Sequence, residues 1–204
     1  MTTRGSYPKG IARRAAILQA ALDVFEREGL SGSSLRTIAK ESGLSLTGLL
    51  HHFPTREHLL ADVLREVDDR AEEAYAQFGT GIDVGEYLAK VMEANSAEPA
   101  RVVLYISLLA EATSPGHPAA EYFCDRFHRL REVIAELVRH QFPEQCERGT
   151  IDADFVASSL VAAADGIQNQ WLYDRTIDMG QHIRQTWAML TGQSGDSPGE
   201  ADHT

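Results

Sequence analysis

Two adjacent histidines, His51 and His52, are the residues of this sequence that most readily suggest chemistry. Imidazole is a common metal ligand and a common general base. Neighbouring side chains on a helix point about 100° apart, so zinc binding by this pair would need two or more further ligands from elsewhere. A catalytic base would need a nucleophile beside it in a cleft, and the sequence marks none. We therefore expect no metal site, no cofactor and no catalytic site here.

The overall composition is ordinary for a globular chain. Of the 204 residues, 43% are hydrophobic and 24% are charged, and no apolar run is long enough to cross a bilayer. The first residues lack the apolar core of a signal peptide, so we expect a cytoplasmic protein with no membrane partner. The two cysteines, Cys124 and Cys146, are too few for a disulfide framework. We expect each to be a free, buried thiol; the alternative is a redox pair.

Positive charge is concentrated near the start of the chain. Residues 1–60 carry 8 Lys and Arg against 5 Asp and Glu, a net charge of +3, whereas residues 61–204 carry 11 against 25, a net charge of −14. This is the pattern expected of a chain in which only the basic segment meets phosphate, because the acidic body repels nucleic acid. The total of −11 therefore does not exclude a nucleic-acid partner.

Helical periodicity extends over the whole chain, and no stretch shows the period-two alternation of a strand. We therefore predict an all-α fold of about nine helices. Gly29 and Gly43 end the first two helices, and Pro54 ends a very short third one. The residues suited to cap later N-termini are Ser33–Ser34, Ser45, Thr55, Asp83 and Asp152. The predicted helices cover, to within a few residues, 8–28, 35–42, 46–52, 56–78, 84–95, 99–112, 118–142, 153–173 and 179–191.

The second and third helices have the spacing of a helix-turn-helix. Ala39 is small where the third helix crosses the second, and Gly43, four residues later, tolerates the positive φ of a tight turn. The apolar residues that would anchor both helices are Leu35, Ile38, Leu44 and Leu49. In a helix-turn-helix the later helix can lie in the DNA major groove, so the outward residues of the third helix are candidates for base contacts.

The segment LRTIAKESGLSLTGLLHHFPTREHLL resembles the DNA-binding segment of the TetR family of bacterial transcription repressors. The shared pattern falls on Ile38-Ala39, Gly43, Ser45, Leu49, His51-His52-Phe53 and Thr55-Arg56-Glu57. It is specific over residues 12–63 and loose through the remaining helices. One departure concerns Leu50, which stands where the family usually has an aromatic residue that contributes a phosphate or base contact.

The resemblance implies three parts: a helix-turn-helix DNA-binding domain at 1–54, a ligand-binding and dimerisation domain at 55–191, and, from its composition, a disordered tail at 192–204. It places His51 toward the groove or the phosphates and His52 partly toward the first helix. Arg13 and Arg14, beside Lys9, could follow the minor groove or nearby phosphates; alternatively each is only a solvated charge. The implied DNA-binding residues are Lys9, Ser34, Arg36, Thr37, Ser45, Leu46, Thr47, Gly48, Leu50, His51, Thr55 and Arg56.

The middle helices, by the same resemblance, enclose a pocket for a small-molecule effector. Apolar and aromatic side chains with a few polar groups are typical of such pockets. The alternative is that these side chains are only core. The predicted pocket residues are Tyr105, Leu108, Leu109, Tyr122, Phe123, Phe127, His128 and Asn169.

The last two helices are expected to form a homodimer seam. Small residues such as Ala162 and Gly166 allow backbones to approach closely, although they also serve packing within one chain. The predicted interface residues are Leu160, Ala164, Ile167, Trp171, Ile183, Trp187 and Leu190.

The resulting hypothesis is a ligand-responsive repressor that binds a palindromic operator in double-stranded DNA as a homodimer and is released by a small apolar or amphipathic effector. The alternatives are a regulator of the same fold that acts through a protein partner, and an all-α enzyme using His51, His52 or the region of Glu111 and His128. The enzyme alternative lacks a paired acid and base, a phosphate loop or metal-ligand spacing.

Overall fold

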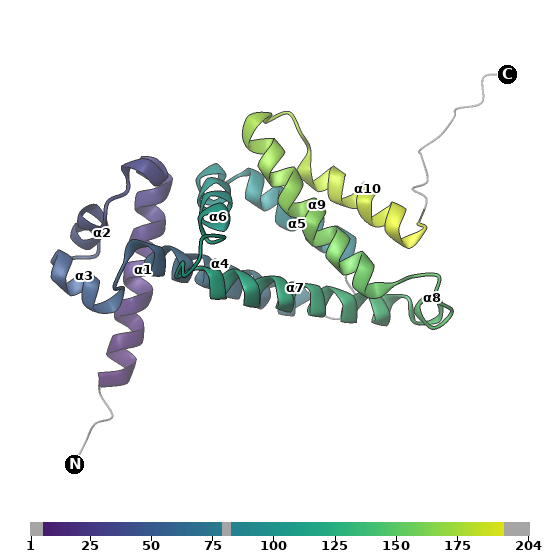
Figure 1. The fold of residues 1–204 in the computed structure, drawn as a ribbon, viewed down its shortest axis with the longest axis horizontal. Coiled ribbons are helices and arrows are strands. Elements are labelled where there is room, and N and C mark those ends of the chain that lie inside the picture. Colours follow the sequence, from purple (N-terminus) through teal and green to yellow (C-terminus); the bar gives the residue numbers. More distant parts are fainter. Residues whose placement is uncertain (1–5, 79–82, 194–204) are drawn as a thin grey trace, which may run out of the picture. The chain divides into compact units, whose positions relative to one another are not determined.

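The computed structural model describes residues 6–78 and 83–193, with side chains throughout except at positions 6–9, 11, 30–32, 72 and 74–78. The described chain is helical, with no strand, and contains ten helices (Figure 1). The predicted all-α class is therefore confirmed. The helices are α1 (Ser6–Gly32), α2 (Leu35–Glu41), α3 (Leu46–His52), α4 (Arg56–Phe78), α5 (Val84–Ser96), α6 (Pro99–Glu111), α7 (Ala120–Gln141), α8 (Pro143–Glu147), α9 (Ala153–Tyr173) and α10 (Met179–Thr191). All but the first two residues of the predicted tail at 192–204 lie outside the described residues.

The additional helix, relative to the nine predicted, is α8. Pro143 ends α7 because it lacks an N–H, and the same residue begins a new turn at its own N1 position, where a missing N–H costs nothing. The first helix also differs in its end. Helical structure resumes after Gly29 and continues to Gly32, but Gly29 itself has φ 71° and ψ 174°, so the predicted break at this glycine is present as a kink.

The predicted N-caps lie at the starts of the helices as expected. Ser34 Oγ accepts from the N–H of Thr37, and Ser45 Oγ accepts from the N–H of Gly48. Farther along the chain, Asp83 Oδ1 accepts from the N–H of Glu86, and the Asp152 carboxylate caps α9. These side chains satisfy amides that a helix N-terminus otherwise leaves without a partner.

The described chain divides into two compact units. The first, which we call the head unit, comprises residues 1–80 and 95–126, with α1 to α4, α6 and the start of α7. Its core lies along α1, where Ile17 and Val24 are fully buried, and α1 packs against α2, α4 and α6. α4 and α6 belong to this unit because they pack on α1, and the division of the chain after residue 54 stays a prediction.

The second unit, which we call the C-terminal unit, comprises residues 81–94 and 127–204. Its core is built from α5, the later part of α7, α9 and α10. Trp187 is central: its Nε1–H donates to Asp83 Oδ2 at 3.1 Å, and its indole lies 5.7 Å from the Phe142 ring. Gly85 is required there, since a Cβ at this position would lie 2.3 Å from Trp187 Cγ.

Two sequence expectations concern burial and membranes. Cys124 is exposed and Cys146 is half-buried, so the prediction of a buried thiol is wrong for Cys124, whose position on α7 faces solvent. Within residues 6–78 and 83–193, no helix combines the length and the hydropathy needed to cross a bilayer.

Candidate nucleic-acid interface

The turn between α2 and α3 is closed by backbone hydrogen bonds. Gly43 has φ 67°, and its N–H donates to Lys40 O at 3.0 Å, while the N–H of Leu44 donates to Ala39 O at 2.7 Å. This pattern satisfies the last carbonyls of α2 with a glycine in the left-handed region, as in many helix C-termini. Ala39 is 2% exposed, so a small side chain is needed where the two helices meet. The predicted helix-turn-helix is therefore present.

The short helix α3 has one anchored side and one open side. Leu49 is fully buried, and Phe53, directly after the helix, is 1% exposed. Thr47, Leu50 and His51 are exposed, and they share a face because they are three and four residues apart. The predicted DNA-binding residues Leu46 and Gly48 are half-buried at the edge of that face. A Cβ on Gly48 would lie 3.3 Å from Ser45 Oγ, so this glycine lies against the cap of its own helix.

Two arginines from α1 hold this arrangement in place. Arg13 donates to Gly43 O at 3.3 Å, and Arg14 donates to His52 O at 3.5 Å. Arg14 also pairs with Asp62 and stacks 4.5 Å from the centroid of the Phe53 ring. These contacts brace the turn and the C-terminal end of α3. Arg13 and Arg14 therefore make contacts within the head unit. From the sequence they were candidates for DNA contacts.

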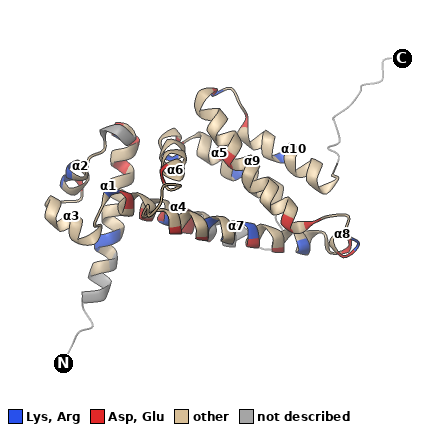
Figure 2. Cartoon of the chain, in the orientation of Figure 1, with Lys and Arg blue, Asp and Glu red and all other residues tan. Residues whose placement is uncertain are grey.

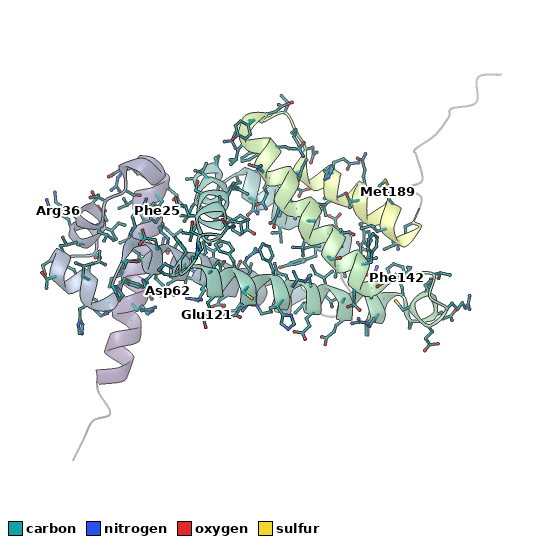
Figure 3. The ribbon with its side chains drawn as sticks, viewed as in Figure 1. Phe25, Arg36, Asp62, Glu121, Phe142 and Met189 are labelled. Carbon is teal, nitrogen blue, oxygen red and sulfur yellow. The ribbon has the colours of Figure 1, made fainter. Side chains whose placement is uncertain are left out.

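The remaining predicted DNA-binding residues fall into two groups. Three hydroxyls are engaged in caps: Ser34 lies 2.9 Å from Thr37 Oγ1, Ser45 caps α3, and Thr55 lies 3.0 Å from His58 Nδ1. The cations differ in exposure: Arg36 projects from α2 into solvent (Figure 3), whereas Arg56 is half-buried. Lys9 is in α1, but its side chain lies outside the described side chains.

His51 and His52, the residues that most readily suggested a metal or catalytic site, lie at the end of α3. Their rings meet edge to face, with centroids 5.9 Å apart. His51 is exposed, and His52 is half-buried with its carbonyl bound by Arg14. In the part of the chain that the structure describes, no three His, Cys, Asp or Glu side chains are grouped as metal ligands.

Charge on the head unit is borne by the helices beside α3, because α3 itself contains no Lys, Arg, Asp or Glu (Figure 2). Arg36 and Lys40 are both exposed on α2. A neutral helix with exposed Thr, Leu and His side chains, flanked by cations, has the composition of a surface that reads base edges while its neighbours meet phosphates.

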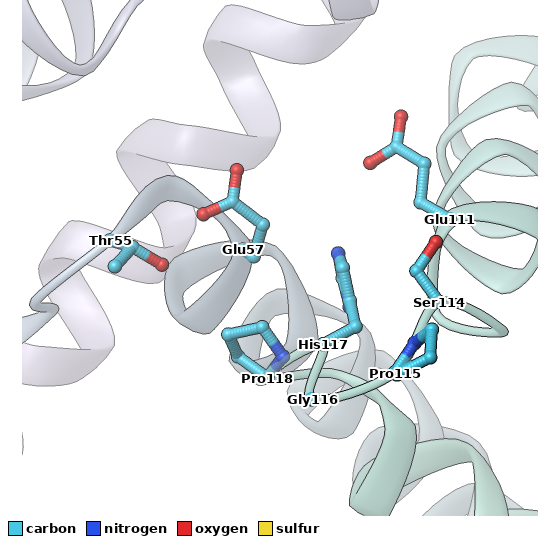
Figure 4. Close-up of a pocket in the computed structure, with 8 residues that line it drawn as sticks. All are labelled: Thr55, Glu57, Glu111, Ser114, Pro115, Gly116, His117 and Pro118. Carbon is cyan, nitrogen blue, oxygen red and sulfur yellow. The ribbon is translucent and has the colours of Figure 1, made fainter.

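An open depression of about 450 Å³ lies between the start of α4 and the segment that connects α6 to α7 (Figure 4). Its lining residues are Thr55, Glu57, Glu111, Ser114, Pro115, Gly116, His117 and Pro118. Hydrogen bonds from Thr55 and from its own backbone amide lower the pKa of Glu57, with smaller contributions from the positive charges of Arg56 and His117. None of the predicted effector residues lines this depression, although Glu111, named for the enzyme alternative, does.

The head-unit members of the predicted effector pocket gather around an ion pair that the sequence analysis missed. Arg126 Nε donates to Asp68 Oδ2 at 2.9 Å, and Tyr122 OH donates to the same oxygen at 2.7 Å. Arg126 also donates to Tyr105 OH at 3.2 Å, and the Phe123 ring lies 4.8 Å from that of Tyr122. Burial and the nearby Asp68 charge raise the pKa of Tyr122. The segment EYFCDRFHRL showed that Arg126 lies among aromatic residues, but nothing in it indicated Asp68, 58 positions earlier.

The other pocket predictions have different environments. Leu108 is buried with Tyr105, Tyr122 and Phe123, and Leu109 and Phe127 are half-buried. His128 is 72% exposed and lies 3.6 Å from Glu132, one turn later on α7. Asn169 is also exposed. Helical periodicity turns these last two side chains toward solvent, so their place in a pocket stays a prediction.

The predicted dimer residues of α9 and α10 point into their own chain. Leu160 and Ile183 are fully buried, and Ile167, Trp171 and Trp187 are at most 5% exposed. Ala164 and Leu190 are half-buried. A side chain already buried in its protomer has little surface left for a partner, so the five buried residues belong to the core of this chain, and their role at a dimer interface stays a prediction.

Each of these two helices also has an open side. Phe155, Tyr173 and Met189 are 61%, 89% and 80% exposed, and Met189 projects from α10 in Figure 3. Ala162 and Gly166 lie exposed between Phe155 and Tyr173 of α9, at helical spacing. This set of five residues, which we call the outer face, combines apolar exposure with room for close approach.

Sequence comparison identifies relatives of the chain. Residues 17–63 match the model for bacterial regulatory proteins of the tetR family. The chain is 33% identical to the HTH-type transcriptional regulator RutR of Escherichia coli over 123 residues, which are 60% of this chain and 51% of RutR, so the match spans about half of that relative. It is 27% identical to the HTH-type transcriptional regulator PksA of Bacillus subtilis over 76% of each chain. Both relatives are regulators rather than enzymes.

Structural comparison extends the likeness to most of the chain. A transcriptional regulator from Rhodococcus sp. Rha1 superimposes with a TM-score of 0.67 at 21% identity, covering 88% of this chain and 96% of that one. The multidrug binding protein EbrR, complexed with imidazole, superimposes with a TM-score of 0.60 at 27% identity, covering 87% and 94%. Residues 17–63 thus carry the pattern of the tetR family of bacterial regulatory proteins, and the chain beyond them shares the fold of these regulators.

Proposed function

We propose that the protein is a ligand-responsive transcriptional repressor that binds a palindromic DNA operator as a homodimer. The observation that carries this proposal is the open face of α3. Thr47, Leu50 and His51 are exposed there, on a helix whose other side is fixed by buried Leu49. A helix held so firmly, with one face left open, is suited to enter a major groove.

Charge supports the same assignment. The exposed cations Arg36 and Lys40 lie on α2, whereas residues 61–204 carry a net charge of −14. Phosphate contacts fix the register of a protein on duplex DNA, and base contacts supply the sequence preference. We assign Arg36 to phosphate contact and Thr47 to base contact.

Selection from a randomised duplex pool at low salt tests the DNA proposal. We expect the wild-type protein to enrich a palindrome whose half-sites are separated by about one helical turn, roughly 34–36 Å. Thr47→Ala should change the enriched sequence, while Arg36→Gln should weaken binding to all sequences and lower the salt slope by about one per protomer. Failure of dimeric wild-type protein to enrich any sequence would refute the proposal.

For the homodimer we propose the outer face of α9 and α10 in place of the buried residues predicted from the sequence. Its exposed Phe155, Tyr173 and Met189 supply apolar area, and Ala162 with Gly166 lets two α9 helices approach. A twofold pairing of one such face with itself gives the closed symmetry that a palindromic site requires.

For the effector we propose an aromatic or amphipathic small molecule bound in the head unit at the cluster of Tyr105, Tyr122 and Phe123. These side chains are at most 7% exposed, so binding requires their rings to move apart. The structures of EbrR with malachite green and with ethidium support this chemistry in a relative of the same fold. The Asp68–Arg126 pair would supply polar contacts beside the rings. Mass spectrometry of small molecules extracted from the purified protein tests this, with Tyr105→Ala as the variant expected to lose the bound compound.

A further inference from the structure

Among the side chains of the head unit that the structure describes, Leu50 is the large apolar one that stays exposed, at 37%. It follows directly after fully buried Leu49 on α3, and it shares the open face with Thr47 and His51. The described side chains of its own chain leave 37% of its surface open. An exposed leucine at the centre of a face assigned to DNA calls for a complementary apolar group on the DNA.

We propose that Leu50 reads the 5-methyl group of a thymine in each operator half-site. This inference rests on the proposed DNA-binding function and adds the chemical feature that one residue recognises. The thymine methyl is the apolar group that unmodified DNA displays in the major groove; the other groups at base edges there are hydrogen-bond donors and acceptors.

The chemistry of leucine makes the assignment selective. A leucine side chain has no donor or acceptor, so it can neither bind a phosphate oxygen nor pair with the polar edges of adenine, guanine or cytosine. Placing it against those edges would remove water from polar groups without replacing the hydrogen bonds, which is unfavourable. Against a methyl group the same burial is favourable. Leu50 therefore discriminates by both attraction and exclusion.

The neighbouring residues are compatible with this role. Thr47 lies three residues before Leu50 and carries a hydroxyl and a methyl group, while His51 offers an imidazole beside it. Thr47 and His51 can form hydrogen bonds to base edges, and Leu50 then supplies the apolar contact with the DNA. Helix α3 contains no Lys, Arg, Asp or Glu, so no such side chain of this helix competes with Leu50 for contact with the groove.

Replacing thymines by deoxyuridine tests the inference, because this change removes the methyl group and keeps every Watson–Crick contact. Each thymine of the enriched operator is replaced in both half-sites, and the Kd is measured for wild type, Leu50→Ala and Leu50→Met. One methyl contact contributes about fourfold per half-site, or roughly fifteenfold for both. We expect that loss at one symmetric thymine for wild type and Leu50→Met, and a change below about twofold for Leu50→Ala.

The outcomes separate the inference from the function on which it depends. Operator binding in which no thymine shows a Leu50-dependent effect overturns the inference and leaves the DNA-binding proposal intact. Absence of any enriched operator for the wild type overturns both. Because Leu50 is exposed, its variants should melt with the wild type, so circular dichroism distinguishes lost contact from lost fold.

Discussion

Helices α3 and α9 differ in how well their sequences reveal which side is buried. In α3, the buried side chain is Leu49 and the open face carries Thr47 and His51, as the pattern indicated. In α9, the residues expected to face a partner, such as Leu160 and Trp171, are buried in their own chain. The comparison shows that a helix can be predicted correctly in position and still be turned the wrong way.

The physical reason lies in composition. α3 is seven residues long, and the turn at Gly43 with the cap at Ser45 fixes its rotation against α2. α9 presents Ala, Val, Leu and aromatic residues on several sides, so two faces satisfy the same periodicity. When both faces are apolar, the position of neighbouring helices decides which one is buried, and that information is distributed over α5, α7 and α10.

The largest predicted effect is a loss of stability caused by a substitution on the buried side of α9. Leu160→Ala removes a fully buried side chain from the core that contains Val156 and Trp187, so we expect a loss of about 3–4 kcal/mol of unfolding free energy. Chemical denaturation at a fixed protomer concentration measures it, because dimerisation adds a concentration-dependent contribution. The Leu160→Ala protein should remain dimeric under native conditions.

The matched change on the outer face is Ala162→Arg. We expect little loss of helix content by circular dichroism, but a monomer by analytical ultracentrifugation, since the added charge would have to be buried against a second α9. If Leu160→Ala dissociated the dimer and Ala162→Arg did not, the corrected assignment of the two faces would itself be wrong.

Sequence alone therefore predicted the local features of this molecule better than the distant ones. The caps at Ser34, Ser45, Asp83 and Asp152 are decided within four residues, and all were foreseen. The contacts of Arg14 with Asp62 and of Arg126 with Asp68 join residues 48 and 58 positions apart. No periodicity indicates such pairs. For that reason the contacts by which Arg14 braces α3 and the ion pair in the aromatic cluster were missed.

A second prediction contrasts two glycines. Gly85→Ala places a Cβ 2.3 Å from Trp187 Cγ, and the buried indole is held by Asp83, so we expect a loss of about 2–3 kcal/mol. Gly10→Ala in α1 meets no atom within 4 Å and should stabilise the protein slightly through helix propensity. Thermal unfolding of the two variants provides the measurement. Equal melting temperatures would contradict the tight approach of α5 to α10.

A third prediction distinguishes the arginines that brace the head unit from those assigned to phosphate. Arg14→Gln removes the Asp62 pair and the stacking on Phe53, both partly exposed, so we expect a loss of about 1 kcal/mol in stability. Arg36→Gln should change stability by less than about 0.5 kcal/mol, since its side chain is exposed. Denaturation of both variants without DNA tests this, and a larger loss for Arg36→Gln would reverse the assignment.

The smallest predicted effects concern two carboxyl groups, one in each unit. Hydrogen bonds from Thr55 and from its own amide lower the pKa of Glu57, whereas the Arg184 guanidinium lowers that of Glu86. A carboxyl whose pKa is lower in the folded state stabilises the fold above its unfolded pKa and loses that contribution as the pH falls through the folded value. Glu57→Gln and Glu86→Gln should therefore each reduce stability at neutral pH and match the wild type in acid.

Salt separates the two causes. An exposed ion pair such as Glu86 with Arg184 is screened by added salt, whereas hydrogen bonds to a hydroxyl and an amide adjacent in the chain are affected less. In a carbon-13 NMR titration, we expect 0.5 M NaCl to move the Glu86 pKa upward toward its usual range by more than it moves that of Glu57. An equal response would mean that Arg56 and His117, rather than Thr55, dominate at Glu57, and the first turn of α4 would then be an electrostatic site like its counterpart in α5.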